Sequence, residues 1–420
     1  MTKQTIGTPE FTHSIGVYQF VWKDLGLTVN VERLDDDGIG ELAFRHKNGT
    51  SDSQLLHRTK ANLLSTTTMT QLAKRLKENA DFDWTTILTY VTAMSLDALR
   101  AGTPLVNINE PPASMALDYM LYPILVKNEP TSLFAPGASA KSILADFIAI
   151  QVQFGVCGLD WTPEPADVLY LDWEASEEEH KRYITAIKKG LKVNDDTPIL
   201  YRHCDRPLVN IVDTIRKDIV DYHVGLVILD SMMAATATSG HGQDASQIAG
   251  EYYNALHSFG CTTLTIDHVT KEGMTGFTEN IAPYGSVVKY NRSRSQFEVK
   301  QQQEPGEDYM ELALIHRKFN LGRRLKPLGI RVDFINDNDI LKEVRFGKMN
   351  LADNPALAKN LSTTDKLIAQ LRSGNKVVSD LVNLLDTKEN NIYQALNRGL
   401  KKGLFIKLSD DSWGLKEYDR

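Results

Sequence analysis

The sequence predicts a chain of three folded parts, of which the central and largest is an α/β domain with a mostly parallel sheet. Three observations predict this fold class. The chain has 420 residues, which is too long for one hydrophobic core and fits two or three domains. Strand-like and helix-like segments alternate through its middle. The runs VLYLDW and VGLVILD are apolar without period-two alternation, which is typical of strands covered on both faces.

The first part, residues 1–112, is predicted to be a small α+β domain. Short alternating runs between residues 15 and 58, with the turn sequences DDDG and KNGT, indicate an antiparallel sheet. The apolar spacing then becomes helical at residues 68–76 and 84–99. The segment TPLVNINEPP, residues 103–112, is expected to form a linker or the entry segment of the next domain.

The second part, residues 113–348, carries the alternating pattern. We expect buried strands at 132–135, 168–173, 224–230 and 261–267, with helices at 141–153 and 176–191. After Gly285 the runs SQFEV, YMELALIHR and LGIRVDFI predict hairpins.

The third part, residues 361–420, follows a linker at 349–360 and changes character again. Three short helical segments precede LFIKLSDDSWGL, which predicts a hairpin with an Asp-Asp-Ser turn. Three helices followed by a hairpin is the order of a winged-helix domain.

A candidate phosphate loop, LFAPGASAKS, opens the second part. Lys141 and Ser142 match the end of the pattern GxxxxGK[ST], in which backbone N–H groups and a lysine at a helix start bind phosphate. Alanine stands at both signature glycine positions, 135 and 140. Alanine is tolerable wherever the backbone is not at positive φ. The competing interpretation is an ordinary strand–turn–helix junction with Pro136-Gly137 as its turn. The proposed nucleotide-binding residues are Ala135, Pro136, Gly137, Ala138, Ser139, Ala140, Lys141 and Ser142.

Acidic residues end two of the buried strands, where ligands bind in open parallel sheets. Asp230 ends LVILD, and with Ser142 it is the predicted Mg²⁺ site. Glu174 follows Asp172 after the strand YLD and is the candidate general base. The alternative is that Asp172 and Glu174 only cap the next helix. His268 follows a third strand at the same edge and is a candidate γ-phosphate sensor.

The motifs LFAPGASAKS, VLYLDWEAS, LVILDSMM, LTIDHVTK and YGSVVKYNRSRSQFEV follow one another in this order. Together they resemble the RecA-type ATPase core of the RepA hexameric helicases and the related DnaB group, over roughly residues 114–346. The resemblance implies that Lys141 and Ser142 hold phosphate and Mg²⁺, that Asp230 is the Walker B acid and that Glu174 is catalytic. It also implies a role for His268. The layout is similar, too, to bacterial and mobile-element proteins described as AAA-type ATPases.

The same resemblance implies an arginine finger, which would complete the site of a neighbouring subunit. Gly285-Ser286 precedes Arg294 at the spacing of that motif. Arg292 is the competing candidate, and Lys289 is a possible assistant. The alternative is that RSR forms a solvated strand edge.

Two regions are candidates for binding DNA. The loops 234–246 and 271–286 would line the channel of a ring, although they contain one lysine, Lys271, and are equally compatible with active-site lids. The stronger candidate is the last helix, whose basic and amide side chains could contact duplex DNA: Lys388, Asn390, Asn391, Gln394, Asn397, Arg398, Lys401 and Lys402. The hairpin adds Lys407 and Trp413, whereas Asp410 and Asp411 at its tip would repel phosphate. Winged helices also bind proteins.

Composition limits the class of protein. The net charge of −7 and the pI of about 5.8 argue against a uniform coating of nucleic acid. Cys157, Cys204 and Cys261 form no CxxC pair, so a zinc ribbon or a disulfide framework is not expected. Without an apolar signal core or a membrane-length apolar run, the expected location is the cytoplasm.

Two functional hypotheses follow. The first is an oligomeric ATPase, with a hexamer favoured, that uses ATP and Mg²⁺ as a DNA helicase or translocase in replication of a plasmid, phage or integrated element. Single-stranded DNA would pass through the ring and duplex DNA would contact the winged helix. The second is an ATP-switched DNA-binding regulator or adaptor with slow or no hydrolysis, which the alanines of the phosphate loop favour. Residues 1–110 contain no zinc motif or acidic cluster that would support a primase.

Overall fold

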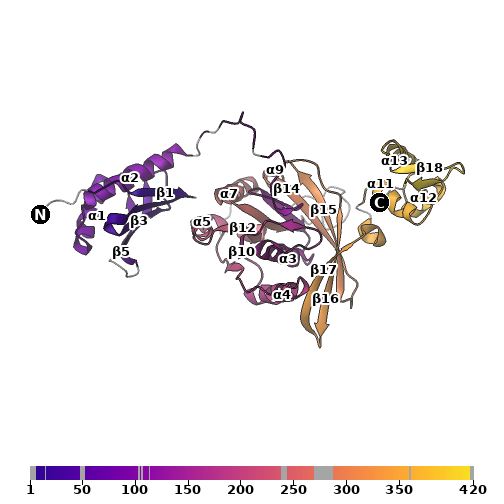
Figure 1. The fold of residues 1–420 in the computed structure, drawn as a ribbon, viewed down its shortest axis with the longest axis horizontal. Helices are drawn as coiled ribbons and strands as arrows, with labels where there is room; N and C mark the ends of the chain where they lie inside the picture. Colours follow the sequence, from indigo (N-terminus) through magenta and orange to yellow (C-terminus); the bar gives the residue numbers. More distant parts are fainter. Residues whose placement is uncertain are drawn as a thin grey trace. The chain divides into compact units, whose positions relative to one another are not determined.

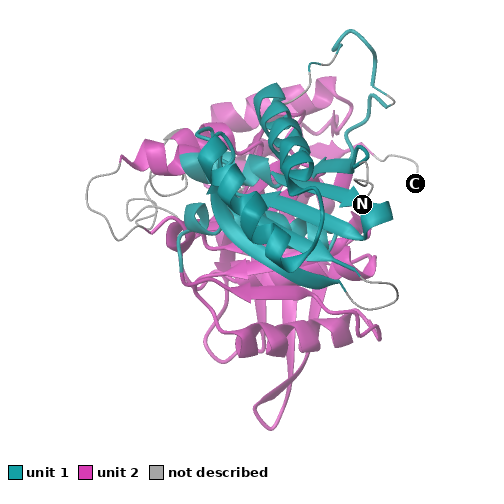
Figure 2. Cartoon of the chain, turned by 90° about the vertical axis from the view of Figure 1, so that its left-hand side faces the viewer, with its two compact units in different colours: residues 1–118, 206–225, 251–261 teal, residues 119–205, 226–250, 262–420 magenta. Residues whose placement is uncertain are grey.

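The computed structural model describes residues 6–14, 16–47, 53–102, 105, 107–112, 114–237, 244–268, 287–358 and 361–416 (Figure 1). The chain divides into two compact units (Figure 2). Unit 1 contains residues 1–118, 206–225 and 251–261, and unit 2 contains residues 119–205, 226–250 and 262–420. No helix in these described ranges is long and apolar enough to cross a membrane.

Unit 1 is built on a five-stranded antiparallel meander in the order β1-β2-β3-β4-β5. Its strands are β1 (Glu10–Ser14), β2 (Val17–Trp22), β3 (Leu27–Glu32), β4 (Ile39–His46) and β5 (Gln54–Asn62). The helices α1 (Thr66–Asn79) and α2 (Trp84–Ala101) follow, and the short 3-10 helix η1 (Lys23–Leu25) joins β2 to β3.

The core of this sheet follows from the sequence pattern. Buried and part-exposed residues alternate along β2 and β3, which buries Phe20 and Val29 on one face. Both helices start at side-chain caps: Ser65 accepts from the N–H of Thr68, and Asp83 accepts from the N–H of Thr86. Trp84, at the start of α2, is buried within this core.

Helix α5 (Val212–Asp221) also belongs to unit 1, although in sequence it lies far beyond residue 112. Ion pairs link it to the meander: Arg33 Nε lies 3.8 Å from Asp213 Oδ2, and Lys217 Nζ lies 4.0 Å from Glu32 Oε1. The sequence gives no indication of this association.

Unit 2 is organised by a nine-stranded sheet in the order β11-β10-β12-β13-β8-β14-β15-β16-β17. Its strands are β8 (Pro130–Ala135), β10 (Asp167–Asp172), β11 (Leu200–His203), β12 (Val224–Asp230), β13 (Thr262–His268), β14 (Ser295–Gln302), β15 (Tyr309–Phe319), β16 (Leu328–Asp337) and β17 (Ile340–Met349). The pairs β10–β11, β12–β13, β13–β8 and β8–β14 are parallel, and β14 to β17 continue antiparallel. The mixed α/β sheet agrees with the predicted fold class of the core, while β11 and β17 were not predicted.

Two helices that follow sheet strands position the site. Helix α3 (Lys141–Phe154) begins directly after the loop that leaves β8, and α4 (Glu177–Gly190) follows β10. They contact each other, and α3 also contacts β8 and β10. The buried residues of α3 include Leu144, Phe147 and Ile148, which explains why this helix is apolar along most of its length.

Smaller elements complete the described part of the chain. They are β6 (Tyr119–Tyr122), β7 (Leu125–Val126), β9 (Thr162–Pro163), η2 (Leu208–Asn210), α6 (Met232–Ala235), α7 (Ala245–Ser258), α9 (Val287–Arg292), η3 (Leu351–Asp353) and α10 (Pro355–Ala358). The loop predicted at 234–246 is shorter at both ends than expected, because α6 extends to Ala235 and α7 begins at Ala245.

The C-terminal residues form α11 (Thr363–Arg372), α12 (Val378–Leu385), α13 (Glu389–Lys401) and the two-stranded β18 (Phe405–Lys407) and β19 (Trp413–Leu415). Their core contains Leu367, Leu381, Leu396, Phe405 and Trp413. This is the element order expected from the sequence. Trp413 is 2% exposed, which corrects its inclusion among the side chains of a DNA-facing hairpin.

Candidate nucleotide site

The phosphate loop connects β8 to α3 and has two alanines in left-handed backbone. Ala138 has φ of 56° and Ala140 has φ of 58°, whereas Gly137 is not at positive φ. Alanine was expected to be harmless away from positive φ, but Ala140 stands in this conformation and so introduces strain. The hydroxyl of Ser139 donates to the Pro136 carbonyl at 2.7 Å, which closes the loop on itself.

Lys141 occupies the interior of this loop. Its side chain is buried, and its ammonium donates to the carbonyls of Ala135 at 3.2 Å and Pro136 at 2.8 Å. Burial lowers the pKa of Lys141, while the nearby carboxylates of Asp230, Glu174 and Asp267 oppose that effect. A cation is therefore held at the N-terminus of α3, where backbone N–H groups also favour an anion.

The predicted metal ligands lie in contact. Ser142 Oγ donates to Asp230 Oδ2 at 2.6 Å, and Tyr170 OH donates to the same oxygen at 3.2 Å. Burial raises the pKa of Asp230, although the hydrogen bond from Ser142 opposes that effect. A hydroxyl and a carboxylate beside a phosphate loop fit Mg²⁺, which uses one or two protein oxygens together with substrate phosphates and water. No group of three or more His, Cys, Asp or Glu that could hold a metal occurs among the described residues.

Glu174 lies at the same edge of the sheet. Its Oε1 accepts a hydrogen bond from Ser231 Oγ, and His268 Nε2 lies 3.3 Å from the same atom. The contact with His268 is the main cause that lowers the pKa of Glu174, and Ser231 and Lys141 act in the same direction. Glu174 is therefore an ionised carboxylate at neutral pH, as a general base requires.

Asp172 caps the turn that precedes α4 rather than the helix itself. Its Oδ1 accepts from the N–H groups of Glu174 at 2.9 Å and Ala175 at 3.1 Å. The cap of α4 itself is Ser176. Glu174 does not cap the helix, which leaves its carboxylate at the site.

Strand register explains why these residues meet. His268 is paired with Ala135 across β13 and β8, and Trp173 N donates to the Asp230 carbonyl at 2.7 Å. The carboxyl ends of β8, β10, β12 and β13 therefore form one edge, which carries Lys141, Ser142, Glu174, Asp230 and His268.

The basic residues considered for the site of a neighbouring subunit, Arg294, Arg292 and Lys289, have different surroundings. Arg294 directly precedes β14 and lies at the opposite end of β8, where its backbone N–H donates to the Pro130 carbonyl. Its Nε is 3.6 Å from Glu129 Oε2, and its side chain is about half exposed. Lys289, by contrast, is buried and lies 3.1 Å from Asp267 Oδ2 of its own chain. Arg292 ends α9 and is exposed. Gly285-Ser286 and Lys271 lie outside the described residues, as do 238–243 of the loop after Asp230.

The sequence did not indicate four side chains behind the site: Asp146, Tyr170, His180 and Tyr201. His180 Nδ1 lies 2.9 Å from Asp146 Oδ1, and Tyr201 OH donates to Asp172 Oδ2 at 3.0 Å. The one available signal was helical spacing, because His180 shares the apolar face of α4 with Ile184 and Ile187.

The residues proposed for DNA contact share one exposed face. Lys388, Asn390, Asn391, Gln394, Asn397, Arg398, Lys401 and Lys402 are all exposed on or beside α13, which buries Ile392 and Leu396 on its other face. In the hairpin, Lys407 Nζ lies 2.7 Å from Asp411 Oδ1, so its charge is already paired.

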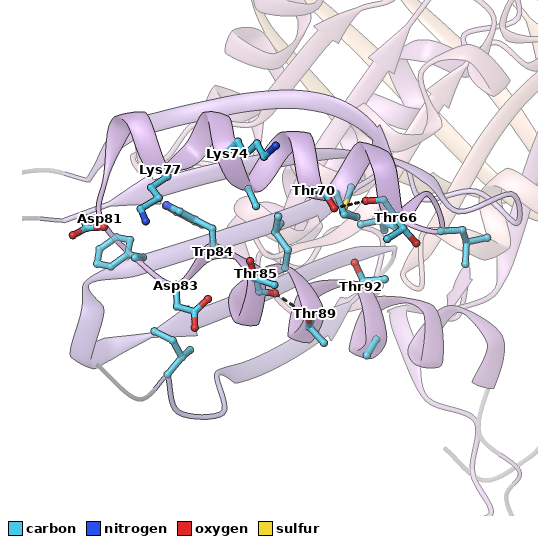
Figure 3. Close-up of a pocket in the computed structure, with 18 residues that line it drawn as sticks. Thr66, Thr70, Lys74, Lys77, Asp81, Asp83, Trp84, Thr85, Thr89 and Thr92 are labelled. Atoms are coloured by element: carbon cyan, nitrogen blue, oxygen red, sulfur yellow. Dashed lines mark hydrogen bonds between the residues drawn. The ribbon is translucent and has the colours of Figure 1, made fainter. Parts of the chain in front are cut away.

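A hollow of about 1130 Å³ lies in unit 1, between α1 and α2 (Figure 3). Threonines line much of it, together with Lys74, Lys77, Asp81 and Asp83. The hydroxyls of Thr70 and Thr89 bond back to carbonyls of their own helices. Since its opposite charges balance, this hollow gives no indication of a nucleotide.

One comparison with known proteins bears on the central part of the chain. Residues 100–274 match the family model of an AAA domain. No curated protein is similar enough in sequence to count as a relative. Among solved structures, the KaiC-like protein of the hyperthermophilic archaeon Pyrococcus horikoshii matches with a TM-score of 0.37 and 12% identity, over 54% of this chain and 93% of that one. At this TM-score the likeness supports no conclusion about this chain. The domain match and the strand order together support a RecA-like P-loop ATPase core.

Proposed function

We propose that this protein is an oligomeric ATPase that hydrolyses ATP with Mg²⁺ and acts on DNA as a helicase or translocase of the RepA and DnaB type. The observation that carries the proposal is the convergence of Lys141, Ser142, Asp230 and Glu174 on one edge of the sheet. A phosphate-binding lysine, a metal-binding pair and an ionised base are the parts that phosphoryl transfer to water needs.

The protein groups have separate tasks in this mechanism. Lys141 and the N-terminus of α3 would bind the phosphates, while Ser142 and Asp230 would hold Mg²⁺, whose contribution would be to neutralise negative charge. Glu174 orients the attacking water and accepts its proton. Both contacts of Glu174 among the described side chains use Oε1, so Oε2 is the oxygen assigned to the water.

The alternative function, a nucleotide switch on DNA, rests on Ala138 and Ala140. Their strained backbone would disfavour the loop conformation that binds phosphate. The position of Glu174 favours hydrolysis instead, because its carboxylate contacts His268 and Ser231, the residue next to Asp230, as a base that orients water would.

Steady-state ATP hydrolysis with and without single-stranded DNA separates the two functions. Wild type, Lys141→Ala and Glu174→Gln are compared, with nucleotide affinity and particle mass measured on each. A DNA-stimulated activity that Glu174→Gln lacks, although it still binds ATP, supports the motor. Tight binding without turnover in wild type supports the switch.

DNA contact by α13 is proposed from its exposed cations. The double variant Lys401→Ala/Lys402→Ala is expected to weaken duplex binding and to reduce the salt slope of log K by about 2, one unit for each lost phosphate contact. Lys407→Ala is the matched control, because Lys407 is paired with Asp411. If the double variant binds like wild type at every salt concentration, α13 does not contact DNA.

A further inference from the structure

Three buried charged side chains lie in a row directly behind Glu174, each from a different element. Asp146 comes from α3, His180 from α4 and Asp172 from β10. His180 Nδ1 lies 2.9 Å from Asp146 Oδ1, and His180 Nε2 lies 3.4 Å from Asp172 Oδ2. The three residues are 1%, 4% and 0% exposed, so the row is shielded from water.

The row is charged. Burial would lower the pKa of His180, but its contacts with Asp146 and Asp172 outweigh burial and raise it. Burial raises the pKa of Asp146 against the opposing bond from His180. Burial also acts to raise the pKa of Asp172, yet the nearby imidazole of His180, the bonds from two backbone N–H groups and the bond from Tyr201 lower it overall.

Asp172, at one end of this row, bonds to the backbone of the candidate base, Glu174. Asp172 Oδ2 faces His180 and Tyr201, while Asp172 Oδ1 accepts from the N–H groups of Glu174 and Ala175. A carboxylate that bonds to two consecutive N–H groups fixes the local backbone. The orientation of the Asp172 carboxylate thus determines the position of the Glu174 backbone, from which the Glu174 side chain extends to the site.

Asp146, at the other end of the row, is part of α3, the helix that follows the phosphate loop. Asp146 is in α3, the helix that starts at Lys141, and its side chain points to α4. The row therefore spans from the helix that binds phosphate to the turn that carries the base. A buried ion pair alone is weak evidence of stabilisation, because desolvation offsets the attraction. Its connection to both halves of the site is the more specific feature.

We propose that His180 is a positioning residue for ATP hydrolysis, holding Asp172, and through it Glu174, in register with the phosphate loop. The inference rests on the proposed ATPase activity. His180 does not touch substrate in this role. It fixes the position of the Glu174 carboxylate, which acts on the attacking water. A misplacement of about 1 Å at a reacting group costs on the order of 100-fold in rate.

The main test compares His180→Gln with wild type. Its kcat is expected to fall about 10- to 100-fold, while the Kd for Mg-ATP stays within about threefold, since Lys141, Ser142 and Asp230 are untouched. His316→Gln is the matched control, a buried histidine on β15 outside the site, and it should keep wild-type kcat. Full turnover by His180→Gln, or an equal loss in His316→Gln, would overturn the proposal.

The double variant Glu174→Gln/His180→Gln tests whether His180 acts through Glu174. If it does, the double variant hydrolyses ATP no more slowly than Glu174→Gln alone. A further loss equal to that in the wild-type background would show an independent, merely structural effect.

A readout without turnover keeps the proposal separate from the proposed function. Hydrogen exchange at the amides of Glu174 and Ala175 should be at least about tenfold faster in His180→Gln than in wild type, because Asp172 no longer holds them. If wild type fails to hydrolyse ATP, the ATPase proposal fails, and this exchange still decides whether His180 positions the turn. Unchanged exchange would refute that role.

Tyr201→Phe provides a second variant in case His180→Gln does not fold. It removes the hydrogen bond from Tyr201 to Asp172 Oδ2 and leaves the ion pair of His180 with Asp172 in place. We expect kcat to fall severalfold and the amides of Glu174 and Ala175 to exchange severalfold faster than in wild type. Wild-type values of both would count against the proposal.

Discussion

Left-handed backbone at two alanines makes the phosphate loop a strained segment. Without strain, the methyl group of Ala140 would be of no consequence, but at φ of 58° it costs roughly 1–2 kcal/mol. Glycine would remove that cost at the price of a more flexible unfolded chain.

Ala140→Gly is therefore expected to stabilise the protein by about 0.5–1 kcal/mol, which raises the melting temperature by about 2 °C. Thermal unfolding of the nucleotide-free protein measures the change. Gly137→Ala is the matched control in the same loop: it is not at positive φ, and an added Cβ would meet nothing within 4 Å, so it should not destabilise. A lower melting temperature for Ala140→Gly would contradict the strain.

His316 gives the second prediction at this scale, a dependence of stability on pH. Its Nδ1 accepts from the N–H of Leu325 at 3.1 Å, its Nε2 lies 3.0 Å from Ser295 Oγ, and burial lowers its pKa to about 4. Between pH 6.5 and about 4 the unfolded chain binds a proton at this residue that the folded chain does not. The free energy of unfolding therefore falls as pH falls, by up to about 1.4 kcal/mol per pH unit.

Denaturation of wild type and His316→Gln at pH 7.5, 6 and 5 checks this sign. The advantage of wild type over the variant should narrow toward low pH, because the variant lacks the titrating group. A difference that stays constant across these values would show that His316 is not responsible.

Candidate site residues that belong to a sequence motif could be predicted from the sequence, and those outside any motif could not. Lys141, Ser142 and Asp230 could be named as candidates because each belongs to a short pattern next to a strand, and the structure brings them to one edge of the sheet. Asp146 and His180 are 34 positions apart and meet only through the packing of α3 on α4. No local pattern records that contact.

At the scale of elements, the buried parallel strands were predictable because both faces are apolar. The edge strands β11 and β17 were not. β17 has exposed lysines and an arginine along its length, and β11 is only four residues long. Their partners in the sheet, rather than their own composition, make them strands.

The contact of α4 with β17 yields the third prediction. A Cβ at Gly190 would lie 2.0 Å from the carbonyl oxygen of Val344, which is backbone and cannot rotate away. Gly190→Ala should therefore cost about 1–3 kcal/mol and lower the melting temperature by several degrees.

Gly347→Ala on β17 is the matched control, because its added Cβ would meet nothing within 4 Å. Calorimetry of both variants measures the difference. Equal melting temperatures for the two would mean that α4 does not pack closely on this strand.

For the whole molecule, the position of Arg294 predicts dependence on assembly. Arg294 lies by Glu129 at the end of β8 opposite the phosphate loop, so it cannot serve its own site. A head-to-tail arrangement of copies would bring it to a neighbour.

Arg294→Ala should then lower kcat at least about 100-fold in the assembled protein without changing nucleotide affinity. Mixing it with Glu174→Gln should restore activity, because about a quarter of randomly formed interfaces combine an intact base with an intact arginine. Arg292→Ala is the neighbouring comparison and should remain active. A mixture no more active than its parts would reject the finger.

The position of β8 in the sheet has a consequence for protein synthesis. Every residue of β8 is buried, and its two neighbours, β13 and β14, come more than a hundred residues later in the chain. At ribosomal speeds, on the order of ten seconds pass before either partner exists. During that time the segment that will carry the phosphate loop is an apolar strand with both edges open, which makes it a segment of the nascent chain that a chaperone would protect from aggregation.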